Sequence, residues 1–242
     1  MEKNQSFKTF ILDLAFNLVI PVLILQKGSK FFGENGPMIA LVIALAFPVG
    51  FGLYDLLVKK KKNLISALGL INILFTGGFA LMGLTKNWYL LKEFLLPALI
   101  AAYILYTTLR DKPFIEKVFY NESVFNVSRI ESHFKNTNER ETLKKHLLRS
   151  TQLLALSFVL SAVLNLVIAE RIFTDIPYYW NALERAAIRN NEIAEMKKMA
   201  YFIIFLPSIA MTSFIIWHLV SGLRKMTGLT MEEIMASHLN EK

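Results

Sequence analysis

The sequence predicts an all-α fold: a polytopic transmembrane bundle of six helices, both termini cytoplasmic, with short interfacial amphipathic helices. Three observations support this prediction. Six apolar blocks each approach the roughly 20 helical residues that cross a bilayer core. The 242-residue chain is 54% hydrophobic, which is too apolar for a soluble domain of this size. Its basic residues are concentrated on one side of the blocks.

The first four blocks follow one another closely. They are Thr9–Leu25, Pro37–Val58, Leu64–Leu84 and Trp88–Leu109. Their short connections predict that sequential neighbours pack antiparallel. The first block is followed by Gln26-Lys27-Gly28 without a small-residue cleavage site, so we expect a retained anchor rather than a cleaved signal peptide. Gly77-Gly78 in the third block is interpreted as a packing or kink pair.

A polar connection, residues 110–150, separates the fourth and fifth blocks. Its segment Phe114–Phe119 has apolar residues at helical spacing and predicts a short amphipathic helix in the inner interface. Phe125, Ile130 and Phe134 continue the apolar pattern. The alternative is a solvated linker with incidental aromatic residues. The Asn138–Glu141 spacing is typical of a helix cap and predicts a helix running into the fifth block.

The last two blocks, Thr151–Ala169 and Ala200–Leu223, are joined by a long outer loop. Its aromatic cluster of Tyr178, Tyr179 and Trp180 is typical of the lipid headgroup layer. From Trp180 to Met199 the pattern predicts a charged amphipathic helix that leads into the sixth block.

Charge decides the predicted topology. With six crossings, 18 of the 27 Lys and Arg residues lie on the side of the termini and eight on the opposite side. The run Lys59–Lys62 lies in a short loop on the richer side. The positive-inside rule therefore places both termini in the cytoplasm. We expect one integral membrane domain over residues 1–242, with the lipid bilayer as partner and no nucleic acid.

Seven polar side chains within the blocks are candidates for a functional site, because polar groups are costly in hydrocarbon. They are Asp13, Asn17, Asn72, Thr76, Glu93, Asn165 and His218. One interpretation is hydrogen bonding between packed helices. Another is a proton or ion track from Asp13 through Asn17 and Asn72 to Glu93.

Two further alternatives concern single residues. Asp13 facing His218 is a specific pairing hypothesis, whereas a lone histidine near a helix end often only reaches toward the interface. Glu93 follows Trp88 and Tyr89, which mark the interface, so its carboxylate reaching water is the alternative to a place in the track.

The sequence contains no enzyme signature. It has no cysteine, which excludes disulfides and thiolate sites. A His-Glu-x-x-His motif, a Gly-x-Ser-x-Gly motif, a phosphate-binding glycine loop and clustered histidines are all missing. We therefore expect no enzyme, no catalytic residues, no cofactor and no metal.

An ordered set of motifs lies within Lys62–Phe119. It comprises Lys62-Asn63-Leu64-Ile65-Ser66, Leu74-Phe75-Thr76-Gly77-Gly78, Trp88 with Lys92, and Lys112-Pro113-Phe114-Ile115 ending at Val118-Phe119. This order resembles the septation protein A family of bacterial inner membrane proteins. Leu164–Ala169 is similar to that family's Ala-Asn-x-x-x-Ala element. The longer cytoplasmic connection and the longer outer loop depart from the pattern of that family. With Asp13-x-x-x-Asn17-x-x-x-Pro21 and Tyr54-Asp55, the chain looks closer to a branch of six-span bacterial membrane proteins.

The resemblance implies a multi-pass protein of the bacterial inner membrane. It further implies a non-enzymatic role in cell-envelope maintenance or septation through membrane partners of envelope synthesis. The intramembrane polar residues indicate an alternative, a small transporter or channel for ions, protons or a small solute. For that alternative we expect a homodimer, because six short spans enclose little volume.

Overall fold

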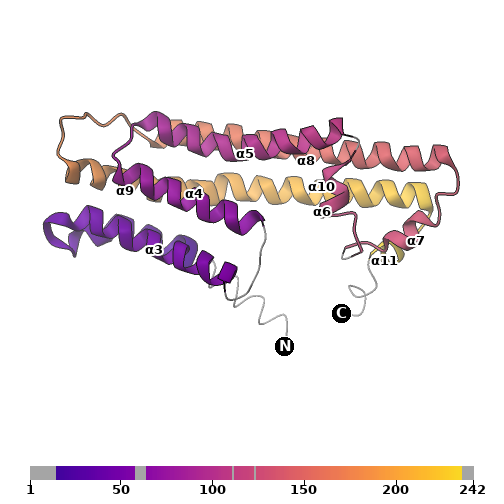
Figure 1. The fold of residues 1–242 in the computed structure, drawn as a ribbon, viewed down its shortest axis with the longest axis horizontal. Coiled ribbons are helices and arrows are strands. Elements are labelled where there is room, and N and C mark those ends of the chain that lie inside the picture. The colour runs from indigo at the N-terminus through magenta and orange to yellow at the C-terminus, as the bar shows by residue number, and fades with distance from the viewer. Residues whose placement is uncertain (1–14, 58–63, 111, 123, 236–242) are drawn as a thin grey trace. The chain divides into compact units, whose positions relative to one another are not determined.

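The computed structural model describes residues 15–57, 64–110, 112–122 and 124–235 (Figure 1). Within these ranges all regular secondary structure is helical, apart from an isolated β-bridge between Phe125 and Met235. The predicted all-α class is confirmed. Asp13 and the run Lys59–Lys62 lie outside the described residues.

The chain divides into two compact units, each built from segments that are distant in sequence. The first unit holds the residues up to Phe94 together with Leu164–Ile204, and the second holds Leu95–Val163 together with the residues from Phe205 onward. The single integral membrane domain expected from the sequence stays a prediction.

The first unit is formed by helices from both ends of the chain. It contains η1 (Ala15–Val19), α2 (Ile20–Lys27), η2 (Gly28–Lys30), η3 (Gly33–Asn35), α3 (Gly36–Leu57), α4 (Leu64–Leu81), the start of α5 (Lys86–Leu109), the end of α8 (Thr137–Ile172), α9 (Ala182–Met199) and η4 (Ala200–Ile204). Helices α3 and α4 lie side by side, and α9 contacts α2, α3 and α4 (Figure 1). Its core includes Leu25, Leu41 and the stacked rings of Tyr89 and Phe173.

Helix α4 ends at Leu81, three residues before the end of the predicted block. The reason is Gly83, which has a φ of +63°, a left-handed conformation that favours glycine. The Leu84 N–H then donates to the Phe79 carbonyl at 3.0 Å and closes the helix end. This turn leads directly into α5.

The second unit contains the rest of α5, α6 (Phe114–Val118), α7 (Val127–Glu131), the first part of α8, α10 (Phe205–Thr227) and α11 (Met231–Ile234). The predicted helix near Phe114 is confirmed as α6. The Ile115, Phe125, Ile130 and Phe134 side chains are buried in one cluster that also includes Leu219 of α10. The solvated-linker alternative for residues 110–150 is therefore wrong, because the aromatic and branched residues of this stretch form the core of the unit.

The predicted start of the long helix is displaced by two residues. The Asn136 side-chain oxygen accepts from the Glu139 N–H at 2.9 Å, and the Glu139 carboxylate accepts from the Lys135 N–H at 2.8 Å. The cap is thus built on Asn136 rather than on Asn138. The expected continuity is confirmed, because α8 runs without interruption from Thr137 to Ile172.

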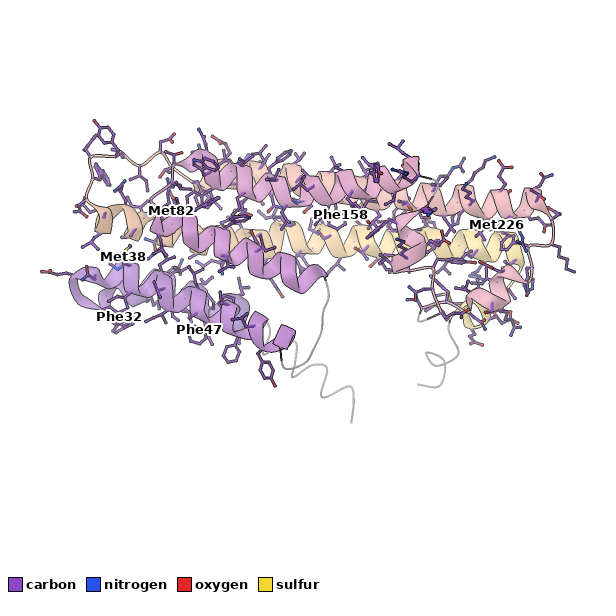
Figure 2. The ribbon with its side chains drawn as sticks, in the orientation of Figure 1. Phe32, Met38, Phe47, Met82, Phe158 and Met226 are labelled. Carbon is purple, nitrogen blue, oxygen red and sulfur yellow. The ribbon has the colours of Figure 1, made fainter. Side chains whose placement is uncertain are left out.

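Four helical segments in the described part of the chain are long and apolar enough to cross a membrane: Gly33–Gly50, Lys86–Leu109, Thr137–Ile172 and Ala182–Thr227. Large apolar side chains project from the helices along their length (Figure 2). Leu99, Phe202 and Trp217 are each about 60% exposed. Such extensive apolar exposure is compatible with an integral membrane protein. The count of six spans and the side of the termini stay predictions.

Candidate intramembrane charge site

The centre of the candidate site is Lys92 on α5, in the first unit. Its side chain is buried, with 8% exposed. The ammonium nitrogen lies 2.6 Å from the Glu93 carboxylate, 2.8 Å from the Thr76 hydroxyl oxygen and 3.3 Å from the Asn72 side-chain oxygen. An ammonium group has three donors. Each donor of Lys92 therefore has an acceptor.

Helix α4 supplies two of these acceptors from one face. Asn72 and Thr76 are four residues apart, so their side chains lie above one another on the helix. The Thr76 hydroxyl donates to the Asn72 backbone carbonyl at 2.9 Å, and this bond orients its oxygen to accept from Lys92. Side-chain hydrogen bonds thus join α4 to α5 inside an apolar segment.

A second cation interacts electrostatically with this group. Lys197, near the end of α9, lies close enough to Lys92 and Glu93 for both charges to act on it. The cluster of Lys92, Glu93 and Lys197 carries two positive charges and one negative charge. In surroundings of low polarity such an imbalance favours a proton-exchanging or anion-attracting site.

Another buried ion pair lies elsewhere in the first unit. The Arg189 and Glu192 side chains are in contact at 2.5 Å and are both buried. Glu192 also accepts from the Thr174 N–H at 2.9 Å and from its hydroxyl at 2.6 Å. The Arg189 guanidinium lies 5.0 Å from the centre of the Tyr89 ring, a cation–π arrangement. These contacts satisfy both charges and fix the connection before α9.

In the second unit His218 pairs with another histidine. The imidazole rings of His146 and His218 are stacked with centroids 4.7 Å apart. The Ser150 hydroxyl donates to the His146 carbonyl at 3.0 Å and lies 3.1 Å from His218 Nδ1. A hydroxyl has one proton, so His218 Nδ1 is the donor in the second contact. The proposed Asp13 partner of His218 lies outside the described residues, and that pairing stays a prediction.

The structure thus brings together three of the seven predicted positions, Asn72, Thr76 and Glu93. Asn17 lies in η1 within the first unit, and Asn165 lies partly buried in the same unit. Asp13 and the side chain of Asn17 lie outside the described part of the chain, so the first half of the predicted track stays a prediction. Its second half, from Asn72 to Glu93, is bridged by Lys92.

Lys92 is not among the seven residues predicted from the sequence, although it is the residue on which Asn72, Thr76 and Glu93 converge. Its signal was present: it is a lysine inside an apolar block, adjacent to a carboxylate. Two of the three residues that hold it, Asn72 and Thr76, come from a separate helix, so the sequence alone did not reveal that contact.

Comparisons with known proteins add no identification, since no family model, curated protein or solved structure matches the chain.

Proposed function

We propose that this chain is a multi-pass protein of the bacterial inner membrane, crossing it six times with both termini cytoplasmic. We further propose that it conducts protons or small ions at the Lys92 site. The observation that carries the second proposal is the convergence of Asn72, Thr76 and Glu93 on a buried lysine within an apolar helix.

The energetics of a buried ion pair favour a working role over a purely structural one. A lysine costs about 2.5–3.5 kcal/mol at the centre of a membrane helix on insertion scales, and reaching toward the interface lowers this cost nearer a helix end. Lys92 is the seventh residue of the 24-residue α5, so part of this cost applies to it. Replacing a buried ion pair by apolar residues of similar size is often neutral or stabilising. A contribution to stability is therefore not a sufficient reason for an ion pair of Lys92 and Glu93 at this position.

The arrangement supports a simple proton-coupled step. A proton delivered to the Glu93 carboxylate neutralises it and leaves the Lys92 and Lys197 ammonium groups without a counter-charge. Release of a proton from Lys92, or entry of an anion, restores the balance. Either event couples the movement of a proton to a change in the contacts between α4 and α5.

Reconstitution tests this proposal. Purified protein is inserted into liposomes loaded with a pH-sensitive dye, and flux is followed under an imposed potential with protons alone, then with K⁺, Na⁺ or Cl⁻. We expect at least a tenfold loss of flux in Lys92→Met and Glu93→Gln. The matched control is Lys198→Gln, which removes a lysine from a half-exposed pair with Glu195. Flux equal to that of empty liposomes for the unaltered chain contradicts the proposal.

A second function is supported by the resemblance to the septation protein A family. In this second function the chain is not an enzyme, and it acts in envelope maintenance or septation by contact with membrane proteins that synthesise the envelope. The exposed apolar residues Phe202, Leu206 and Trp217 offer surface for such contacts. Because the chain has no cysteine, one can be introduced at Trp217 for crosslinking in native membranes. Recovery of no envelope-synthesis protein counts against this function.

A further inference from the structure

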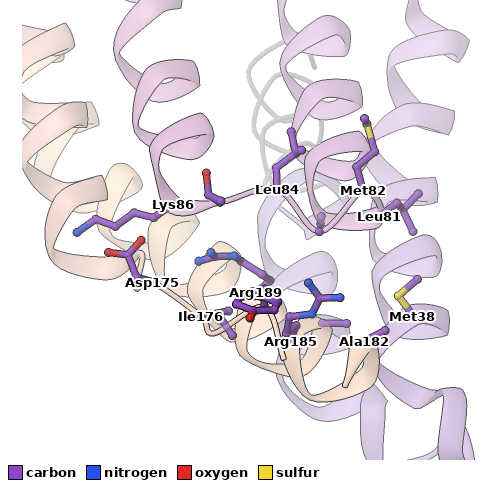
Figure 3. Close-up of a pocket in the computed structure, with 15 residues that line it drawn as sticks. Met38, Leu81, Met82, Leu84, Lys86, Asp175, Ile176, Ala182, Arg185 and Arg189 are labelled. Atoms are coloured by element: carbon purple, nitrogen blue, oxygen red, sulfur yellow. The ribbon is translucent and has the colours of Figure 1, made fainter. Parts of the chain in front are cut away.

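A cavity of about 160 Å³ lies within the first unit, away from the residues that hold Lys92. It is bounded by the turn between α4 and α5, the stretch around Asp175 and the first turns of α9 (Figure 3). Its charged lining consists of Lys86, Arg185 and Arg189 with a single carboxylate, Asp175. The lining therefore has an excess of positive charge.

Two of these three cations already have carboxylate partners. Lys86 pairs with Glu170 at 2.6 Å, and Arg189 pairs with Glu192. Within the described ranges, by contrast, no carboxylate forms a salt bridge with Arg185. Its Nε atom is fully buried and lacks a hydrogen-bond partner among those residues. A buried donor without an acceptor is costly, and a guanidinium cannot lose its proton to relieve that cost.

The surrounding chain holds the Arg185 side chain at the cavity. Figure 3 shows Arg185 and Arg189 extending from α9 toward the turn that carries Leu84. The Arg185 Nη1 atom packs against this turn, 3.7 Å from the position that a β-carbon would occupy on Gly83. The free guanidinium is thus positioned before any ligand arrives.

We propose that this cavity binds a phosphate group, with Arg185 as its principal ligand. Guanidinium and phosphate match in charge and in hydrogen-bonding geometry. The volume is below the roughly 300 Å³ at which pockets for drug-sized ligands begin, so it suits a small group rather than a whole metabolite. The group is supplied either by a phospholipid headgroup or by free phosphate.

The neighbouring sequence favours the lipid as the source. Tyr178 lines the cavity, and Tyr179 and Trp180 follow it with exposed side chains. Aromatic residues of this kind collect at the headgroup level of a bilayer. A lipid phosphate would therefore lie at the depth of the Arg185 guanidinium. This site shares no described residue with the Lys92 cluster, so its test is independent of the proposed conduction.

The test measures binding to the full chain in detergent by native mass spectrometry and by calorimetry. The probes are dioleoylphosphatidylglycerol, dioleoylglycerol, which lacks the phosphate, and inorganic phosphate. We expect phosphatidylglycerol to bind and dioleoylglycerol not to bind. Arg185→Gln should weaken binding of the phosphate-bearing probe at least tenfold, while Arg171→Gln, which removes an exposed arginine of the same unit, should leave it unchanged.

The outcomes separate the two sources. Arg185-dependent binding of phosphatidylglycerol alone supports a headgroup site, and Arg185-dependent binding of inorganic phosphate supports a site for the free anion as well. Binding that is equal in Arg185→Gln and the unaltered chain, or no binding of either phosphate probe, overturns the proposal.

A second variant covers the case in which Arg185→Gln does not fold. Ala182 lines the cavity one turn before Arg185 on α9. Ala182→Glu keeps the arginine and supplies a carboxylate three residues away, within reach of its guanidinium. We expect this variant to stay monodisperse and to lose phosphate binding at least tenfold. Retention of full binding in Ala182→Glu overturns the proposal.

Discussion

The two units of this protein bury polar groups of different kinds. The buried polar side chains described for the first unit are Thr76, Lys92, Arg189, Asn190 and Glu192, three of which carry charge. Those described for the second unit are the two hydroxyl residues Ser150 and Thr151. Both hydroxyls donate to backbone carbonyls one helical turn earlier. Both hydroxyls also contact other elements, since Ser150 lies 3.1 Å from His218 Nδ1 and Thr151 accepts from the Ile115 N–H at 3.3 Å. The difference is therefore one of charge: the second unit buries neutral hydroxyls, whereas the first buries charged side chains that need counter-charges.

This difference bears on where the proposed sites lie. A hydrogen bond from a hydroxyl to its own helix can form wherever that helix forms. A buried charge requires a specific partner at a specific place, and it is retained at a cost in solvation. The proposed conduction and the proposed phosphate site therefore both lie in the first unit, and the apolar core of the second unit has no proposed site.

The largest expected effect comes from breaking the buried Arg189–Glu192 pair. Arg189→Met leaves the Glu192 carboxylate buried without its counter-charge, which typically costs about 3–5 kcal/mol. Thermal unfolding in detergent measures this loss. The double variant Arg189→Met/Glu192→Gln removes both charges and should recover most of the stability. A double variant as unstable as the single one contradicts the assignment of the loss to the stranded charge.

The matched change in the second unit is much milder. Ser150→Ala removes one neutral hydroxyl with its two contacts, and we expect a loss of about 1 kcal/mol. If Ser150→Ala destabilises as strongly as Arg189→Met, the proposed contrast between the units is wrong.

A steric substitution tests the packing of the second unit. A β-carbon at Gly222 on α10 would lie 2.2 Å from a ring carbon of His146, with the two ring nitrogens also within 3 Å. The His146 ring is held by its bond to the Leu219 carbonyl and by stacking on His218, so it has no simple way to move. We expect Gly222→Ala to cost about 1–3 kcal/mol. If Gly222→Ala is as stable as the unaltered chain when both are unfolded in detergent, this expectation is wrong.

The corresponding glycine of the first unit should respond less. A β-carbon at Gly77 would lie 2.3 Å from a terminal methyl of Leu45, and the leucine side chain can rotate to move this methyl away. We expect Gly77→Ala to cost about 1 kcal/mol, at the low end of the range for overpacked cores. Gly78 faces open space, so Gly78→Ala should be neutral or stabilising by up to about 1 kcal/mol through helix propensity. Equal effects at the two positions would contradict the packing of α3 against α4.

The smallest expected effect is a pH response in the second unit. Hydrogen bonds from Thr230 hold the pKa of the Glu233 carboxyl below its ordinary value, with a smaller contribution from the Arg129 charge. Because the pKa is lowered on folding, the contribution of Glu233 is present above its ordinary pKa and is lost as the pH falls through the lowered value. We expect α11 to loosen from α7 in that acidic range.

A fluorophore on a single cysteine at the exposed Met231 reports this loosening, because the chain has no other cysteine. Glu233→Gln should abolish the pH response in that range. A response that persists in the variant assigns it to another group.

The sequence by itself determined the all-helical class, the apolar segments, the helix near Phe114 and the continuous helix into the fifth block. These features depend on local pattern, since periodicity, capping residues and stretches of apolar side chains act within a few turns. It also selected Asn72, Thr76 and Glu93, because a polar side chain in an apolar stretch is visible without knowledge of its neighbours.

Only the tertiary structure decided which of these residues meet. Lys92 receives its acceptors from α4 as well as from its neighbour in sequence, and Arg185 lies at a cavity closed by a turn about a hundred residues earlier in the chain. Whether Lys92 meets Asn72 and Thr76, and whether Arg185 meets a carboxylate, depends on distances of a few ångströms between separate elements. Local sequence patterns carry no information about those distances.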